Sequence, residues 1–142
     1  MKAFLLSAGL GTRLSPLTDT TPKCLLPING RPLLQYWLDH MKRSGVEKVL
    51  INTHKHHDQI ESYCKTWTSL PDIILTREEK LLGTAGTLYA NKSFVDGEED
   101  FFLLYADNIT NVSLSSIYEY HKNKKNSKFT TFAYPTNIPE QK

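Results

Sequence analysis

Short apolar runs without alternating polar residues recur along the chain, and they limit its fold more than any other feature. Five have the length of a strand: residues Ala3–Leu6, Val49–Ile51, Ile73–Leu75, Phe101–Tyr105 and Phe129–Tyr134. Helix-like segments lie between most of them, at Pro32–Ser44, His57–Trp67, Thr84–Asn91 and Leu114–Asn123. Because continuously apolar strands are buried on both faces, the pattern predicts an α/β layer structure with a mainly parallel sheet.

Composition and charge narrow the class of partner. Of 142 residues, 39% are hydrophobic and 23% charged, and no linker, repeat or low-complexity segment divides them, so we expect one domain over residues 1–142. The net charge of +2 is spread along the chain and predicts neither a nucleic acid nor a membrane partner, but a small anionic ligand. The first apolar run is too short for a membrane span or signal peptide. The oligomeric state, including a homo-oligomer, stays open.

The two cysteines and the end of the chain carry further expectations. Cys24 and Cys64 lie far apart without CxxC spacing, which predicts neither a disulfide framework nor a zinc ribbon, and a reducing cytoplasm is the expected compartment. The last apolar run is followed by PTNIPEQK with no closing element. We therefore expect the natural protein to continue past residue 142.

The loop SAGLGTRLSPLTDTTPK, residues 7–23, leaves the first predicted strand at its carboxyl end, where open α/β sheets bind ligands. Gly9 and Gly11 allow positive φ and close backbone approach, while Arg13 and Lys23 supply positive charge. Leu14 breaks the dinucleotide-binding fingerprint, and the Gly-Lys-Ser/Thr of a P-loop is absent. The loop thus predicts a phosphate site of another kind, with a solvated glycine turn as the alternative.

Asp107 directly follows the apolar run FFLLYA, so its carboxylate is expected at the same edge of the sheet. Carboxylates suit Mg²⁺, which binds through one or two of them together with substrate phosphates. A turn or helix-cap aspartate is the alternative, because Asp-Asn begins many turns. The segment GTAG at 83–86 is expected to open a helix whose N-terminus favours an anion, or to be an ordinary glycine-started helix.

A longer set of motifs resembles the signature of the sugar-phosphate nucleotidylyltransferases. In chain order they are GLGTRLSPLT (9–18), PKCLLP (22–27), PL (32–33), GTAG (83–86), YADN (105–108) and NIPE (137–140). The resemblance implies a Rossmann-like three-layer nucleotidyltransferase fold, similar to GT-A, of which this chain holds the N-terminal, nucleotide-binding portion. It also implies transfer of a nucleotidyl group from an NTP to a sugar-1-phosphate, with release of pyrophosphate.

The resemblance further implies roles for individual residues. Arg13 would hold the pyrophosphate leaving group, Lys23 would contact the α-phosphate, and Asp107 would bind Mg²⁺ as the cofactor. The residues implied to bind the nucleotide are Leu6, Ala8, Gly9, Gly11, Thr12, Arg13, Glu78, Gly83 and Thr84. Glu140 would lie on the sugar side of the site. Complete members of the family are longer, and their second half supplies much of the sugar pocket.

The nucleobase is suggested by Glu78-Glu79, where pyrimidine-selective relatives tend to carry glutamine. A carboxylate can accept from both N1–H and the exocyclic amine of guanine, which favours GTP, whereas a solvated turn is an equal alternative. The segment INTHKHHDQI, residues 51–60, is generally similar to mannose-1-phosphate guanylyltransferases. Thymidylyl or uridylyl transfer to glucose-1-phosphate, and a noncatalytic nucleotide-sugar-sensing regulatory module, remain alternatives.

Overall fold

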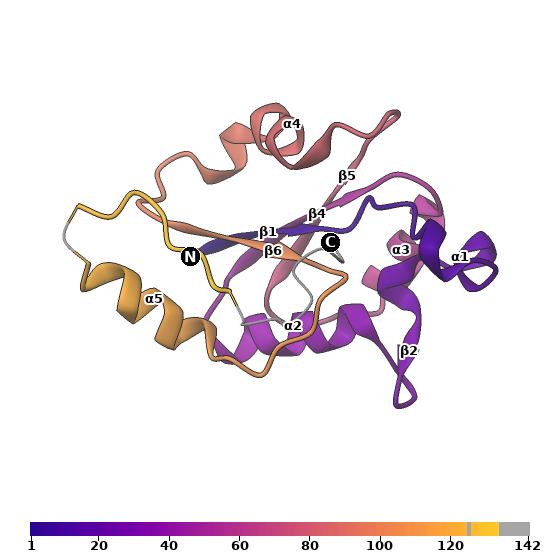
Figure 1. Ribbon diagram of the computed structural model, residues 1–142, viewed down its shortest axis with the longest axis horizontal. Helices are drawn as coiled ribbons and strands as arrows, with labels where there is room; N and C mark the ends of the chain where they lie inside the picture. Colours follow the sequence, from indigo (N-terminus) through magenta and orange to yellow (C-terminus); the bar gives the residue numbers. More distant parts are fainter. Residues whose placement is uncertain (125, 134–142) are drawn as a thin grey trace. The chain divides into compact units, whose positions relative to one another are not determined.

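The computed structural model describes residues 1–124 and 126–133 (Figure 1). Its main sheet has four parallel strands in the order β5-β4-β1-β6. Their bounds are β1 Lys2–Leu6, β4 Lys48–Thr53, β5 Asp72–Arg77 and β6 Phe101–Tyr105. The register pairs Ala3 with Val49 on one side and Phe102 on the other. Four of the predicted strands and the predicted α/β class are therefore confirmed.

The sheet's central strands form the core, because β1 and β4 have a neighbour on each side and are buried on both faces. The side chains of Phe4, Leu5 and Ile51 are fully buried. Phe4 also meets the rings of Phe94 and Phe101 edge-on, with centroids 5.1 and 5.6 Å away. Such continuous burial explains why these strands read as unbroken apolar runs in the sequence.

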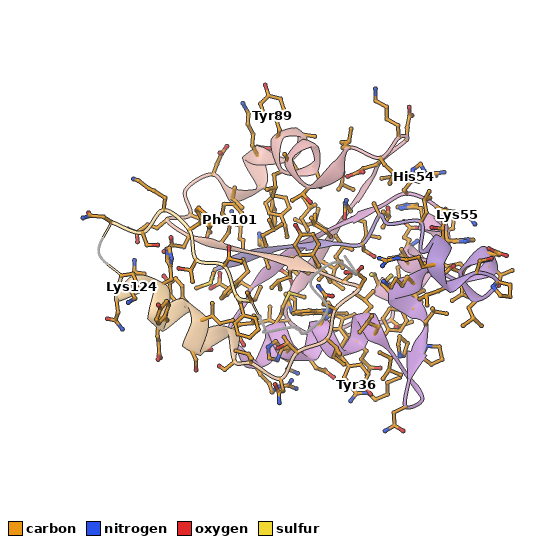
Figure 2. The ribbon with its side chains drawn as sticks, viewed as in Figure 1. Tyr36, His54, Lys55, Tyr89, Phe101 and Lys124 are labelled. Atoms are coloured by element: carbon orange, nitrogen blue, oxygen red, sulfur yellow. The ribbon has the colours of Figure 1, made fainter. Side chains whose placement is uncertain are left out.

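Helices lie on both sides of this sheet within residues 1–111, with α2 (Leu33–Arg43) and α4 (Gly83–Ala90) drawn on opposite sides in Figure 1. Leu34, Leu38 and Met41 recur at helical spacing and form the buried face of α2. Tyr89 marks the solvent side of α4, where it is 76% exposed (Figure 2). In the part of the chain that the structure describes, no helix combines the length and apolarity needed to cross a membrane.

The remaining elements of this unit are short. They are α1 (Leu17–Thr20), α3 (His57–Cys64), the hairpin strands β2 (Pro27–Ile28) and β3 (Arg31–Pro32), and the 3-10 turns Thr12–Leu14, Lys23–Leu25 and Lys92–Val95. Two of these 3-10 turns and α1 lie within or at the end of the loop that follows β1. The loop is therefore locally structured rather than an open glycine turn.

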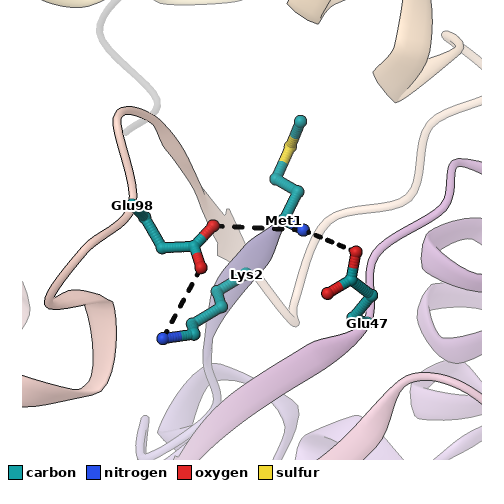
Figure 3. Close-up of polar contacts among 4 residues, drawn as sticks. All are labelled: Met1, Lys2, Glu47 and Glu98. Carbon is teal, nitrogen blue, oxygen red and sulfur yellow. Dashed lines mark hydrogen bonds and ion pairs between the residues drawn. The ribbon is translucent and has the colours of Figure 1, made fainter.

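The amino edge of the sheet, opposite the loop after β1, is held by ion pairs (Figure 3). The Met1 ammonium lies 3.1 Å from Glu47 Oε1 and 3.9 Å from Glu98 Oε2. The Lys2 ammonium lies 3.6 Å from Glu98 Oε1. These contacts connect the start of β1 with the segments that lead into β4 and β6.

The chain divides into two compact units, Met1–Asn111 and Val112–Lys142. In the second unit, α5 runs over Leu114–Lys122. Ser113 caps its N-terminus, because the Ser113 Oγ accepts a hydrogen bond from the Ser116 N–H. The strand predicted at Phe129–Tyr134 is wrong for residues 129–133, which form no strand; Tyr134 lies outside the described residues. Phe129 is 78% exposed. An apolar run becomes a strand only when the backbone groups of another strand pair with it.

Candidate functional site

A cavity of about 460 Å³ opens at the carboxyl edge of the sheet. Its walls come from the loop after β1, the ends of β4, β5 and β6, and the start of α4. The predicted site residues that line it are Leu6, Ala8, Gly9, Gly11, Thr12, Arg13, Lys23, Glu78, Gly83, Thr84 and Asp107. Glu140 lies outside the described residues. The structure thus gathers residues more than 80 positions apart into one place, while their roles toward a ligand remain predictions.

Gly11 is the glycine on which the loop's shape depends. Its φ is +67°, and its carbonyl accepts a hydrogen bond of 2.8 Å from Thr18 Oγ1. A Cβ at this position would lie 2.8 Å from Thr18 Cγ2, closer than packed atoms come. At Gly9, by contrast, the expected positive φ is absent, and a Cβ would meet nothing within 4 Å. The conformational demand therefore falls on the second glycine alone.

The loop is held from behind by two side chains that the sequence did not indicate. His56 Nε2 donates to the Thr18 carbonyl at 3.3 Å, and Gln59 Nε2 donates to the Thr20 carbonyl at 2.8 Å. Both come from the start of α3, where His56 adopts φ +60°. Their contacts fix α1 and, through Thr18, the backbone at Gly11.

The nearby histidines do not gather around a common point. His54 Nδ1 lies 2.7 Å from the Glu78 carbonyl, and His57 Nδ1 lies 2.8 Å from Thr53 Oγ1, while His56 bonds to the loop. Over residues 1–124 and 126–133, no group of three or more His, Cys, Asp or Glu side chains could hold a metal. The histidines form separate polar contacts near the entry to α3.

Arg13, Lys23 and Asp107, which we call the charged cluster, form one part of the cavity wall. Lys23 Nζ lies 3.0 Å from Asp107 Oδ2, and the two side chains keep 27% and 46% of their surface exposed. An ion pair this accessible contributes little to stability, because water and salt screen it. Both charges can therefore change partners when an anion or a cation enters.

Trp37 fixes the backbone beside Asp107. Its indole Nε1–H donates to the Asn108 carbonyl at 2.8 Å, and the Asn108 N–H donates to the Tyr105 carbonyl at 3.3 Å. Trp37 lies within the helix predicted at Pro32–Ser44, and at 6% exposure it is buried. The sequence did not reveal its second task, because the indole donor meets a residue 71 positions away.

Five residues joined by hydrogen bonds form what we call the buried network: Ser7, Asn52, Glu78, Leu82 and Thr87. Ser7, Asn52 and Glu78 also line the cavity. Glu78 Oε1 accepts from Asn52 Nδ2 at 2.9 Å and from Thr87 Oγ1. Glu78 Oε2 accepts from the Leu82 N–H at 3.1 Å. Asn52 Oδ1 in turn accepts from the Ser7 N–H at 2.7 Å. One carboxylate thereby connects the ends of β5 and β4 with α4.

The carboxylate of Glu78 stays charged despite its burial. Only 5% of the residue is exposed, and burial alone would raise the pKa of its carboxyl group. The hydrogen bonds from Asn52, Thr87 and Leu82, with the positive field of His54, outweigh burial and lower the pKa below its usual value. A solvated turn is therefore wrong for Glu78, whereas Glu79 is exposed.

The cavity offers partial coordination for Mg²⁺. Asp107 supplies a carboxylate at its rim, and phosphate oxygens of a substrate would have to complete the ligand set. That division of ligands fits a hard cation bound together with a polyphosphate. Asp107 is thus a suitable ligand for a cation brought in with its substrate rather than one held by the protein alone.

Comparison with known proteins assigns the family. Residues 2–141 match the family model described as nucleotidyl transferase. The putative mannose-1-phosphate guanyltransferase of Sulfolobus acidocaldarius is 32% identical over 124 residues, which are 87% of this chain and 34% of that protein. The UTP–glucose-1-phosphate uridylyltransferase AglF of Haloferax volcanii is 34% identical over 118 residues, covering 82% of this chain and 47% of that protein.

A solved structure agrees with this assignment. A putative glucose-1-phosphate thymidylyltransferase from Bacillus anthracis superposes with a TM-score of 0.76 at 27% identity, covering 88% of this chain and 51% of that one. The chain spans about a third to a half of the length of these relatives. Because the family model covers nearly every residue, this chain belongs to the nucleotidyl transferase family.

Proposed function

We propose that this chain is the nucleotide-binding part of an enzyme that transfers a nucleotidyl group from an NTP to a sugar-1-phosphate. The observation that carries the proposal is the charged cluster, in which Lys23 and Asp107 pair at the mouth of the cavity. The family and the activities named for its relatives support the same reaction. Exchangeable charges suit a substrate that brings both phosphates and a cation.

In the proposed reaction an oxygen of the sugar-1-phosphate attacks the α-phosphorus of the NTP. The bond between the α-phosphorus and the bridging oxygen breaks, and pyrophosphate leaves. Lys23 would leave Asp107 for the α-phosphate, where its ammonium neutralises charge on the attacked group, while Arg13 would hold the departing phosphates. Positioning and charge neutralisation supply most of the catalysis in phosphoryl transfer, and the residues present are of that kind.

Asp107 is the residue proposed to hold Mg²⁺, once Lys23 has moved to the phosphate. The cation would neutralise phosphate charge that otherwise repels the nucleophile. The glycine backbone at Gly11 and the start of α4 at Gly83 and Thr84 would lie against the nucleotide.

For the substrates we propose GTP and mannose-1-phosphate. The relative from Sulfolobus and the likeness of residues 51–60 to mannose-1-phosphate guanylyltransferases favour this pair. The uridylyl- and thymidylyltransferase relatives support glucose-1-phosphate with a pyrimidine nucleotide as the alternative. The two-bond contact from Glu78 to guanine no longer supports GTP, because the carboxylate is engaged in the buried network.

The test is a pyrophosphate-release assay of the enzyme of which this chain is the proposed nucleotide-binding part, crossing GTP, UTP, dTTP and ATP with mannose-1-phosphate and glucose-1-phosphate, each with Mg²⁺. Release with GTP and mannose-1-phosphate is the expected result, and Lys23→Ala should abolish it. Release with a pyrimidine nucleotide and glucose-1-phosphate would keep the reaction and overturn the substrates. No release from any pair would contradict the proposed reaction and favour a nucleotide-sensing role.

A further inference from the structure

Glu78 stands where a residue that reads the nucleobase is expected, yet its carboxylate faces the protein. We propose that Glu78 is a positioning residue: through Asn52 and Leu82 it fixes the two sides of the cavity, and it does not select the nucleobase. That the ligand is a nucleotide rests on the proposed function. The connection between the loop after β1 and α4 rests on the hydrogen bonds of Asn52 and Glu78 alone.

Most acceptor positions of the Glu78 carboxylate are already occupied by donors of the protein. A carboxylate offers about two acceptor positions on each oxygen. On Oε1 both are filled, by Asn52 Nδ2 and Thr87 Oγ1, and on Oε2 one is filled by the Leu82 N–H. One position remains, on Oε2. Reading guanine through N1–H and the exocyclic amine requires one acceptor on each oxygen, so this carboxylate cannot supply the pair.

The hydrogen bonds of Asn52 and Glu78 connect the loop after β1 with the start of α4. The Ser7 N–H, at the start of the loop after β1, is held by Asn52 Oδ1, and Asn52 is held by Glu78 Oε1. The Leu82 N–H, directly before α4, is held by Glu78 Oε2. Ser7 belongs to the loop after β1, whereas Gly83 and Thr84, which follow Leu82, begin α4, and all three line the cavity. Glu78 therefore sets the distance between the loop and α4.

The three side chains at the centre of the network are buried. Glu78, Asn52 and Thr87 are 5%, 4% and 0% exposed, so the bonds among them are shielded from water. Removing one partner from such a network leaves buried groups unsatisfied, and the neighbouring backbone must shift to compensate. The adjacent residue, Glu79, is exposed and offers a matched control for the loss of one negative charge.

The network is tested first without any nucleotide, by amide hydrogen exchange of the 142-residue chain followed by NMR. In Glu78→Gln, the amide group that replaces one oxygen places a donor against existing donors. We expect the Ser7 and Leu82 N–H groups to exchange at least about tenfold faster, and Glu79→Gln to leave both rates unchanged. Unchanged exchange at Ser7 in Glu78→Gln would overturn the connection between the two sides.

The role toward the base is tested by calorimetric titration of the same variants with GTP, UTP and dTTP, each with Mg²⁺. A positioning role predicts that Glu78→Gln weakens all measurable affinities by a common factor, on the order of tenfold, and keeps their ratios within about twofold. A loss confined to GTP would overturn the proposal in favour of base reading. Unchanged affinities would overturn it in favour of a purely structural role.

Two controls keep the outcomes separate. If the native chain binds no nucleotide, the proposed function is contradicted, whereas the exchange rates at Ser7 and Leu82 still decide the network. If Glu78→Gln does not fold, Thr87→Val removes one donor to Oε1 and retains the carboxylate. It should shift the same two amides in the same direction by a smaller factor, and unchanged rates there would overturn the proposal.

Discussion

The charged cluster and Glu78 of the buried network line the same cavity, but their charges are engaged in opposite ways. In the network, Glu78 is 5% exposed and bonded to three neighbours, whereas the Lys23 and Asp107 side chains are 27% and 46% exposed and bonded to each other. A buried carboxylate with both oxygens hydrogen-bonded holds its neighbours in place, while an exposed pair can exchange partners. From this difference we propose that Glu78 supports the site and that Asp107 meets the ligand.

The largest effect is expected from Lys23→Ala. If the charged cluster meets the phosphates, losing a charge-assisted hydrogen bond should weaken NTP binding by about 10- to 100-fold. The free energy of unfolding should change by less than about 1 kcal/mol, because the pair with Asp107 is exposed. Calorimetric titration and urea unfolding measure the two quantities, with Lys55→Ala, an exposed lysine outside the cavity lining, as the control (Figure 2).

A large loss of stability in Lys23→Ala with unchanged NTP affinity would reverse the comparison. Lys23 would then belong with the structural residues. Equal losses of affinity in Lys23→Ala and Lys55→Ala would show that only general charge matters.

Thr87→Val is expected to act in the opposite manner. Thr87 is fully buried, donates to Glu78 Oε1 and accepts from Asn52 Nδ2 at 3.2 Å. Removing its hydroxyl should lower the free energy of unfolding by about 1–2 kcal/mol, because buried polar groups lose a partner. Urea unfolding measures the change. Thr68→Val, at an exposed position, should change the free energy of unfolding by less than about 0.5 kcal/mol. Equal changes in the two variants would contradict a stabilising role of the network.

Acid should weaken the buried network through Glu78. Because its folded-state pKa is lowered, the group contributes stability above the unfolded-state pKa of about 4.5, and this contribution is lost as the pH falls through the folded-state pKa. The unfolding free energy of the native chain should therefore fall below about pH 4.5 more steeply than that of Glu78→Gln. Parallel curves for the two proteins, measured by urea unfolding, would contradict a lowered pKa.

The smallest effect concerns cations. While Lys23 is paired with Asp107 it competes with a divalent ion for the carboxylate. Lys23→Met should raise the affinity of the ligand-free chain for Mn²⁺ by up to about fivefold, as expected for the loss of an exposed ion pair. Arg13→Met removes the same charge from the cavity but keeps the pair, and should change the affinity less. Equal changes, measured by electron paramagnetic resonance, would show that Lys23 and Asp107 do not compete.

The sequence predicted the elements whose signals are local. Continuous apolar runs predicted β1, β4, β5 and β6. The motifs identified Arg13, Lys23 and Asp107, which all line the cavity. It could not separate Glu78 from Glu79, because two adjacent glutamates look alike until one of them meets Asn52 and Thr87. Long-range partners decide burial, and periodicity does not report them.

Other misses share that cause. Nothing in the sequence indicated the contacts that His56 and Gln59 make with the loop at Thr18 and Thr20, because these contacts depend on tertiary packing. The apolar run at 129–133 has strand composition but no strand partner among the described residues. Strand formation is a property of pairs, so composition alone overpredicts it.

The most direct test of the charged cluster is a crystal structure of the chain with Mg²⁺ and whichever of GTP, UTP and dTTP binds most tightly. The account predicts that Lys23 Nζ has left Asp107 and lies within hydrogen-bond distance of the α-phosphate, with Glu78 still bonded to Asn52 and Leu82. A bound nucleotide with Lys23 and Asp107 still paired, or with Glu78 turned away from Asn52 to bond the base, would contradict it.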